Sequence, residues 1–174
     1  MEIEKKYLVK EVPFDYKRYP HKVIEQGYIS VEPVIRIRRA DDRFFLTVKS
    51  KGLLARQEFE MDIEESSYQT LLPKVDGNIV SKRRYVIPLT DTDGSTGDPA
   101  LDGLLKIELD LFEGVYQGLI YAEVEFPSET AANDFKAPAW FYKDVTLDGV
   151  YHNSNLSRMD EKQRRQFLQN IEMI

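Results

Sequence analysis

The sequence has 174 residues, no cysteine and a formal net charge of −6, and 31% of its residues are charged while 42% are hydrophobic. These values fit one domain with its own core, exclude disulfides and thiolate metal sites, and argue against nonspecific nucleic-acid binding. The acidic N-terminus does not resemble a signal peptide, and no run is apolar enough to span a membrane. We therefore predict a single domain over residues 1–174 that resides in the cytoplasm.

Most of the chain alternates apolar and polar residues with a period of two, which is typical of β-strands. The segments with this pattern are residues 2–9, 23–30, 34–39, 44–49, 55–63, 80–87, 105–112 and 119–126. Turn residues separate these segments at hairpin spacing, and Gly27 inside the second of them allows a bulge.

Few stretches of the chain favour a helix. The candidates are residues 12–20, 64–72, 128–132 and 160–174. In the last of these, Phe167, Leu168 and Ile171 share one side, which fits either a cover for the sheet or a homodimer surface. Residues 91–102 are rich in Asp, Thr and Gly and predict a long mobile loop.

About eight strands with little helix between them predict a closed antiparallel barrel. The expected fold class is α+β and mainly β, with short covering helices and a C-terminal helix.

Nearly every predicted strand is apolar on one face and ionic on the other, because residues two apart share a face. The acidic pairs at this spacing are Glu2/Glu4, Glu58/Glu60, Glu108/Asp110 and Glu123/Glu125. The basic residues on strands are Lys6, Arg36, Arg38, Lys49, Arg56, Lys82 and Arg84. Either the apolar faces meet inside a sandwich with the charges in water, or they lie outward beneath helices and the charges line a barrel. The abundance of arginine, which makes bidentate contacts to phosphate, favours the lined barrel.

Such an interior has a chemistry that can be read from its charges. Dense carboxylates bind hard divalent cations, and clusters of Arg and Lys bind phosphate. A polyphosphate that carries Mg²⁺ would satisfy both sets at once.

The order of the short motifs resembles one known family. Glu2-x-Glu4-x-Lys6 is similar to the N-terminal ExExK signature of the CYTH superfamily, the triphosphate tunnel metalloenzymes. The resemblance continues through Gln26-Gly27-Tyr28, Arg36-x-Arg38, Thr47-x-Lys49, Arg56-x-Glu58-x-Glu60, Lys82-x-Arg84-Tyr85, Glu108-x-Asp110, Ala122-Glu123-x-Glu125, Lys143-Asp144-Val145-Thr146 and Tyr151-His152-Asn153-Ser154-Asn155-Leu156. It covers nearly the whole chain and implies an eight-stranded tunnel that hydrolyses triphosphates with Mg²⁺ or Mn²⁺, inorganic triphosphate in the short prokaryotic members.

The resemblance also implies roles for individual residues. The implied metal ligands are Glu2, Glu4, Glu123 and Glu125, with Glu60 and Asp110 as further candidates. The implied triphosphate contacts are Lys6, Arg36, Arg38, Lys49, Arg56, Lys82 and Arg84. Lys6 and Tyr28 resemble a lysine–tyrosine pair proposed to activate or orient the attacking water.

Other functions stay open on the same residues. Thiamine triphosphatase and class IV-type adenylyl cyclase activities are implied for this fold, although no nucleobase-reading motif is evident. A non-enzymatic polyphosphate- or nucleotide-binding module is an alternative of another class, and it could dispense with Lys6, Tyr28 and the acidic pairs.

Several residues depart from the family pattern or fit no catalytic role. The loop at residues 91–102 is longer than in short members, and Ile107 stands where a Trp is common; we expect both near a tunnel rim. His21 and His152 have no second His or acid at ligand spacing, so we expect surface or hydrogen-bonding roles for them.

Overall fold

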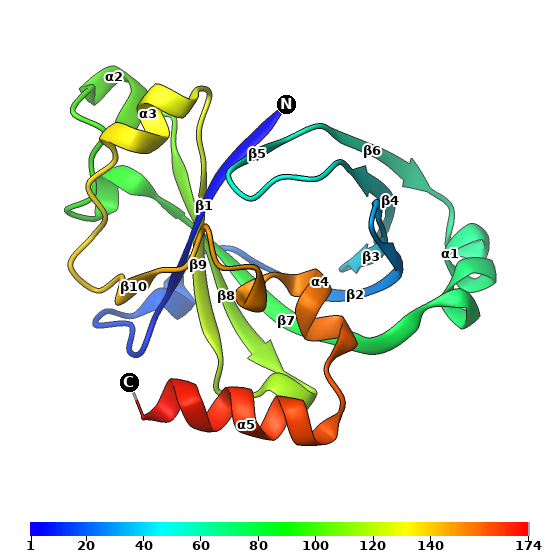
Figure 1. Cartoon of the computed structure of the whole chain (residues 1–174). Coiled ribbons are helices and arrows are strands. Elements are labelled where there is room, and N and C mark those ends of the chain that lie inside the picture. The colour runs from blue at the N-terminus through cyan, green and yellow to red at the C-terminus, as the bar shows by residue number, and fades with distance from the viewer. Residues whose placement is uncertain (174) are drawn as a thin grey trace.

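One antiparallel sheet curls into a nearly closed barrel in the computed structural model, which describes residues 1–173 (Figure 1). The strands are β1 (Glu2–Leu8), β2 (His21–Val31), β3 (Val34–Ala40), β4 (Arg43–Lys49), β5 (Ala55–Arg56), β6 (Glu58–Ile63), β7 (Asp76–Pro88), β8 (Lys106–Glu113), β9 (Ile120–Glu125) and β10 (Lys143–Asp144). The sheet runs in the order β10-β1-β9-β8-β7-β2-β3-β4-β6, and β5 pairs with β1. Residues 1–173 form ten strands where eight were predicted, because residues 55–63 divide into β5 and β6 and the two-residue β10 extends the ladder. The predicted mainly antiparallel barrel is confirmed.

The first strand is where the sheet returns to itself. On one edge, β1 pairs with β9 from Glu4 to Leu8. On the other edge, Glu2 and Ile3 pair with β5, whereas Tyr7 and Leu8 pair with β10. Since only Gln57 separates β5 from β6, the β5 pairs close the barrel at the level of the first acidic residue.

Short helices pack over the outer surface and over one end of the barrel. They are α1 (Glu65–Leu71), α2 (Pro99–Asp102), α3 (Glu129–Asp134), α4 (Asn153–Arg158) and α5 (Glu161–Glu172). Beneath α3, the outward residues Ile3, Ile107 and Val124 belong to one buried apolar cluster, while α1 packs over Ile37. The cover is incomplete over β6, where Phe59 is 62% exposed although its apolar face was expected to lie under a helix. Across residues 1–173, no helix has the length and apolarity needed to cross a membrane.

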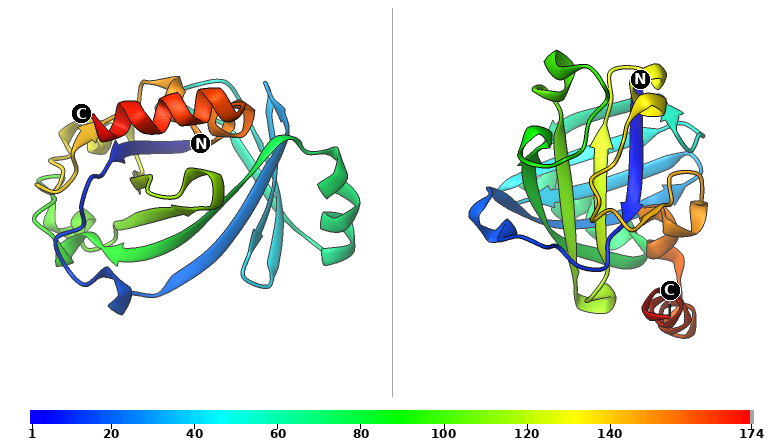
Figure 2. Two further views of the ribbon diagram at one scale, coloured as in Figure 1. Left: turned by 90° about the horizontal axis from the view of Figure 1, so that it is seen from below. Right: turned by 90° about the vertical axis from the view of Figure 1, so that its left-hand side faces the viewer.

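The inward face of the barrel changes character along its length. Beyond the charged residues of β1, β8 and β9, the same face carries Leu8, Phe112 and Tyr121, which pack in a second apolar cluster. Helix α5 lies along this end and adds Phe167 to the cluster (Figures 1 and 2). One end of the interior is therefore filled, and α5 contributes to its cover through Phe167, whereas the homodimer surface stays a prediction.

Gly27 marks a bulge, as its position in the sequence predicts. The register of β2 shifts between Gln26 and Tyr28 against β7, and again between Tyr28 and Ser30 against β3. A Cβ at Gly27 would lie 2.7 Å from the side chain of Val75, so the backbone passes too close for a larger residue. Tyr28 lies two residues from Gln26, which contacts the inward Arg38, and it lines the tunnel cavity.

The segment from Asp91 to Asp102 is more regular than the predicted mobile loop. It ends in α2, and the Asp102 carboxylate accepts hydrogen bonds from the Ser95 and Thr96 hydroxyls, each at 2.6 Å. Ser95 bridges to Lys136 after α3, which places the segment against the outer apolar cluster. The expectation that Ile107 lies at the tunnel rim is wrong, because Ile107 is fully buried in that cluster, whereas Leu101 of α2 lines a second pocket together with Glu108 and Glu125 of the tunnel.

Candidate active site

A polar cavity of about 200 Å³ occupies the open end of the barrel interior. Seven carboxylates line it: Glu2, Glu4, Glu58, Glu60, Glu108, Glu123 and Glu125. Six cations line it as well: Lys6, Arg36, Arg38, Lys49, Arg56 and Arg84. The remaining lining residues are Tyr28, Val34, His152, Asn153 and Ser154. The charged faces of the strands thus point into a tunnel, as the second of the two architectures requires.

The acidic wall consists of Glu4, Glu108, Glu123 and Glu125, which β1, β8 and β9 hold side by side. Glu4 pairs in register with Glu125, and Glu108 pairs with Glu123. One carboxylate oxygen each from Glu4, Glu108 and Glu123 lies within 4.8 Å of the others. Because carboxylate oxygens are the preferred ligands of hard divalent cations, this group fits Mg²⁺ or Mn²⁺.

The carboxylates of the acidic wall have shifted pKa values because they are buried close to one another and to cations. Burial, together with the neighbouring charges of Glu123 and Glu2, raises the pKa of Glu4 well above its usual range. Burial would also raise the pKa of Glu123, but Lys6 and Arg84 hold it well below the usual value. The wall therefore holds more negative charge than its own cations balance, and an added cation would relieve it.

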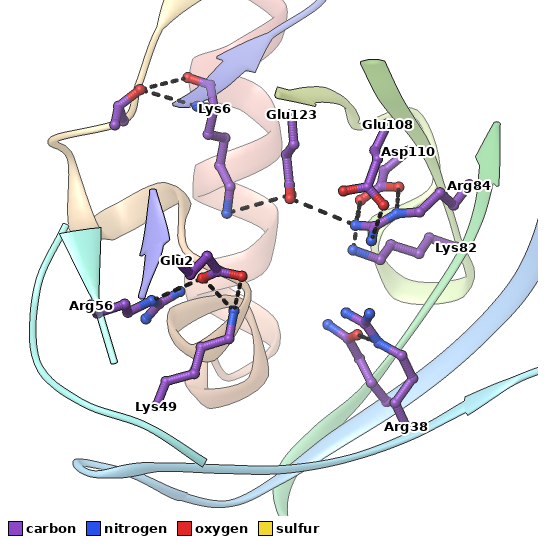
Figure 3. Close-up of polar contacts among 12 residues, drawn as sticks. Glu2, Lys6, Arg38, Lys49, Arg56, Lys82, Arg84, Glu108, Asp110 and Glu123 are labelled. Atoms are coloured by element: carbon purple, nitrogen blue, oxygen red, sulfur yellow. Dashed lines mark hydrogen bonds and ion pairs between the residues drawn. The ribbon is translucent and has the colours of Figure 1, made fainter. Parts of the chain in front are cut away.

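The basic wall consists of Tyr28, Arg36 and Arg38 on β2 and β3. The Arg38 Nε donates to Gln26 Oε1 at 2.8 Å, and within residues 1–173 no ion pair joins Arg38 to a carboxylate (Figure 3). Burial lowers the pKa of Arg38 to about 10, and repulsion from Arg36 and Arg84 contributes. Arg38 is therefore a partly buried cation that would be stabilised by an anion.

A second cation of the basic wall is only partly satisfied. The Arg36 Nη2 donates to the Thr47 hydroxyl at 3.2 Å and lies 3.6 Å from Glu60. Its buried Nε, like the Nε2 of Gln26, has no acceptor in the described part of the chain. Buried donors normally have partners, so this wall is prepared for oxygen atoms that the chain does not supply.

A separate ion network joins Glu2 of β1 to cations of β4 and β5. Lys49 Nζ donates to both oxygens of Glu2, at 2.9 and 3.1 Å, and Arg56 Nε lies 3.5 Å from the same carboxylate (Figure 3). Glu58 lies 3.8 Å from Lys49. Although burial opposes it, the attraction of Lys49 lowers the pKa of Glu2, so this carboxylate is already balanced by the chain.

Lys6 stands between the acidic wall and the filled end of the barrel. Its Nζ lies 3.8 Å from Glu123 and 5.2 Å from the ring centroid of Tyr121. The backbone N–H of Lys6 donates to the Thr146 hydroxyl, which in turn donates to Asp144 at 2.6 Å. The motif at residues 143–146 therefore fixes the strand that carries Lys6.

His152, the residue before α4, lines the tunnel cavity. Burial lowers the pKa of His152 to about 4, and the nearby charges of Lys6 and Arg56 act in the same direction. The imidazole is thus held neutral at one end of the cavity.

Comparison with known proteins identifies the family. No family model matches the chain. An inorganic triphosphatase of Nitrosomonas europaea is 38% identical over 162 residues, covering 90% of this chain and 96% of that protein. An inorganic triphosphatase of Acetivibrio thermocellus is 34% identical over 160 residues, covering 89% of this chain and 92% of that protein. The chain belongs to the inorganic triphosphatases of the CYTH superfamily.

Solved structures agree with this assignment. The crystal structure of an inorganic triphosphatase superposes with a TM-score of 0.64 at 33% identity, covering 92% of this chain and 96% of that one. A Hippeastrum protein reported to have a dominant triphosphatase activity superposes with a TM-score of 0.52 at 16% identity, covering 76% and 83% of the two chains, and it supports the fold alone. The family resemblance found in the sequence is therefore confirmed.

The structure brings most of the predicted site residues into one tunnel. Those that line it are Glu2, Glu4, Lys6, Tyr28, Arg36, Arg38, Lys49, Arg56, Glu60, Arg84, Glu123 and Glu125. Lys82 and Asp110 do not, because both are 0% exposed and bound to each other beneath the tunnel. Sequence reasoning assigned no ligand role to Glu108, although its spacing of two from Asp110 placed it on the same face. It also assigned no tunnel role to His152, although the family motif at residues 151–156 contained it.

Proposed function

We propose that this protein hydrolyses the terminal phosphoanhydride of a triphosphate, most readily inorganic tripolyphosphate, with Mg²⁺ or Mn²⁺. The observation that carries this proposal is the pairing of two walls in one tunnel. Three clustered carboxylates lie on one side, and Arg38, a cation with no carboxylate partner among residues 1–173, lies on the other. The family relationship supports it, since both relatives are inorganic triphosphatases. In the reaction, water attacks the terminal phosphorus, the phosphoanhydride bond breaks, and orthophosphate and diphosphate leave.

Glu4, Glu108 and Glu123 are the residues that would hold the metal ion. Their oxygens converge, and hard divalent cations prefer such ligands. A bound Mg²⁺ would polarise the terminal phosphoryl group and neutralise part of its charge. Glu125 adjoins the group through its pairing with Glu4, whereas Glu2, Glu60 and Asp110 lie outside the three converging oxygens. The ligand set proposed here therefore adds Glu108 to Glu4 and Glu123, with Glu125 as the next candidate.

The cations of the tunnel would bind the triphosphate itself. Arg38 and the buried Arg36 Nε offer donors that the chain leaves without carboxylate partners. Arginine suits this task because its planar fork matches two phosphate oxygens. Lys49, Arg56 and Arg84 line the same cavity and complete the predicted set at its floor and side. In the transition state these charges would stabilise the leaving diphosphate.

Lys6 and Tyr28 are proposed to handle the attacking water. Both line the cavity, Lys6 beside Glu123 and Tyr28 in the opposite wall, and within residues 1–173 no hydrogen bond joins them. A water between the walls could contact either residue. If Lys6 acts on the water, Lys6→Ala lowers turnover with tripolyphosphate more than it weakens substrate affinity, because the interaction matters most in the transition state. Unchanged turnover would show that Lys6 is a phosphate contact or a structural charge.

The size and lining of the tunnel favour an inorganic substrate. Cavities that hold drug-sized molecules usually measure about 300–1,000 Å³ and are mostly apolar. This one measures about 200 Å³, and Val34 is the single aliphatic residue in the lining given above. Thiamine triphosphate and ATP would therefore have to leave their organic groups outside the charged cavity.

A phosphate-release panel tests the proposal. Tripolyphosphate, thiamine triphosphate and ATP are each assayed with Mg²⁺, with Mn²⁺ and with a chelator. We expect tripolyphosphate to have the highest kcat/KM and the chelator to abolish release. Release that is equal in the chelator would refute the metal dependence, and tight binding without release from any substrate would favour the binding module instead.

A further inference from the structure

Lys82 occupies a position unlike that of any other cation on the inward face of the barrel. It lies two residues before Arg84 on β7, yet it is 0% exposed and does not line the tunnel. Its Nζ donates to Asp110 Oδ2 at 2.6 Å and lies 5.4 Å from the ring centroid of Phe112. Lys82 therefore sits at the boundary between the charged cavity and the apolar cluster that fills the barrel end.

Asp110 passes this contact on to Arg84. The Arg84 Nε donates to Asp110 Oδ1 at 2.7 Å, and its Nη2 donates to Asp110 Oδ2 at 2.8 Å. This two-bond contact fixes the plane of the guanidinium. Asp110 is itself 0% exposed, so its carboxylate can turn only if both Lys82 and Arg84 move.

Arg84 in turn contacts two members of the acidic wall. Its Nη1 donates to Glu108 at 2.9 Å, and its Nη2 lies 3.6 Å from Glu123 (Figure 3). Lys82, Asp110 and Arg84 thus form a continuous chain of contacts that ends on two of the three clustered carboxylates. Each link is a charge-assisted contact between side chains that are mostly buried.

We propose that Lys82 is a positioning residue for the metal site and not a triphosphate ligand. By holding Asp110, it fixes Arg84, and through Arg84 it orients the carboxylates of Glu108 and Glu123. To reach a phosphate, Lys82 would have to leave Asp110 with a single partner in a dry environment, which is unfavourable for a buried carboxylate. This inference rests on the proposed function, because it assigns the role through the proposed metal ligands.

Arg38 provides the contrast that makes the proposal testable. Arg38 lines the cavity and bonds only to the amide of Gln26, so its loss should weaken anion binding directly. Lys82 carries the same charge, but its contacts lead through Asp110 and Arg84 to the carboxylates of the acidic wall. If Lys82 acted only as a nearby charge, its removal would leave Mg²⁺ binding unchanged or make it tighter, because one repulsive cation is lost. If it positions the ligands, its removal makes Mg²⁺ binding weaker.

The test compares Lys82→Met and Arg38→Met with the wild type by isothermal titration, after thermal melts have shown that each is folded. Mg²⁺ is titrated without substrate, and tripolyphosphate is titrated in a chelator. We expect Lys82→Met to weaken Mg²⁺ binding by about 10-fold or more, the usual effect of losing an outer-shell partner, with tripolyphosphate binding changed less than 3-fold. Arg38→Met should show the opposite pattern.

The double variant Lys82→Met/Asp110→Asn shows whether Lys82 acts through Asp110. It removes both charges of the pair, so it avoids the unpaired buried lysine that Asp110→Asn alone would create and that could prevent folding. If the chain of contacts positions the ligands, the double variant binds Mg²⁺ at least as weakly as Lys82→Met, because Arg84 then loses its charged two-bond partner as well. Wild-type Mg²⁺ affinity in the double variant would show that Lys82→Met acts only by leaving the Asp110 charge unpaired, and would overturn the proposal.

Two other outcomes separate this inference from the function on which it rests. A Lys82→Met protein that loses tripolyphosphate affinity as strongly as Arg38→Met, with Mg²⁺ binding intact, makes Lys82 a substrate ligand and overturns the inference alone. A wild-type protein that binds no Mg²⁺ refutes the metal site, and the positioning role with it.

Discussion

The acidic wall and the basic wall of the tunnel carry opposite charges, and the chain itself balances each of them only in part. On the acidic wall, Glu108 and Glu123 pair with Arg84. Glu4 lies among other carboxylates, and its pKa is raised. On the basic wall, Arg38 donates to the neutral amide oxygen of Gln26, and its pKa is lowered. The acidic wall thus lacks a cation, and the basic wall lacks an anion. A metal–triphosphate complex supplies both.

The comparison predicts that the same substitution has unequal effects on stability in the two walls. Arg84→Met removes the partner of Asp110, Glu108 and Glu123, so we expect a loss of about 3–5 kcal/mol in the free energy of unfolding, as for other broken buried ion pairs. Arg38→Met removes a partly buried cation that has no carboxylate partner within residues 1–173, so stability should hold or rise. Urea unfolding of both variants measures the difference. Equal losses would show that Arg38 has a partner that this account overlooks.

Activity should depend most on Glu4, the member of the three-carboxylate group that forms no ion pair within residues 1–173. Glu4→Gln keeps the size of the side chain but removes a charged metal ligand, and we expect turnover of tripolyphosphate to fall by about 100-fold or more at saturating Mg²⁺. Glu125→Gln is the matched comparison, because Glu125 pairs with Glu4 but lies outside the three-carboxylate group, and its effect should be smaller. The reverse order would move the metal site toward Glu125.

Loss of the unpaired cation should reduce both binding and turnover. A hydrogen bond from a charged group contributes about 1.5–3 kcal/mol, so Arg38→Ala should lower kcat/KM for tripolyphosphate by roughly 10- to 150-fold. Both KM and kcat should change, because a phosphate contact exists in the ground state and in the transition state. Steady-state kinetics measures the two constants, and a change confined to kcat would assign Arg38 to the transition state alone.

The smallest effect concerns the neutral histidine at the end of the tunnel. The unfolded chain takes up a proton on His152 below its usual pKa of 6.5, whereas the folded protein resists protonation down to about 4. Folding therefore becomes less favourable as the pH falls from about 6.5 toward 4. Melting curves of wild type and His152→Gln over this range should show a steeper decline for the wild type. Parallel declines would mean that His152 is not desolvated in the folded protein.

The barrel itself could be predicted from the sequence because its cause is local. A period of two assigns each residue to a face whatever the rest of the chain does. Residues 34–39 were predicted as a strand, and β3 runs from Val34 to Ala40. The ordered motifs then indicated the family, which fixed the closure of the sheet.

Depth along the barrel could not be predicted, because it depends on segments far away in the chain. Lys82 and Arg84 share a face, but only Arg84 lines the tunnel. The difference arises where Leu156 and Phe167, from α4 and α5, help to fill one end of the interior. The same boundary separates Glu108 from Asp110, so a pattern that placed both acids inward could not tell which one reaches the cavity.

A thermal melt with both ligands tests the central claim, that the two walls are completed together. The protein is melted alone, with Mg²⁺, with a methylene-bridged triphosphate analogue that resists hydrolysis, and with both. A ligand present at 100 times its Kd stabilises the folded state by about 2.7 kcal/mol. We predict that Mg²⁺ and the analogue together raise the melting temperature by more than the sum of their separate shifts. A combined shift no larger than that sum would contradict the account, because the walls would then bind their ligands independently.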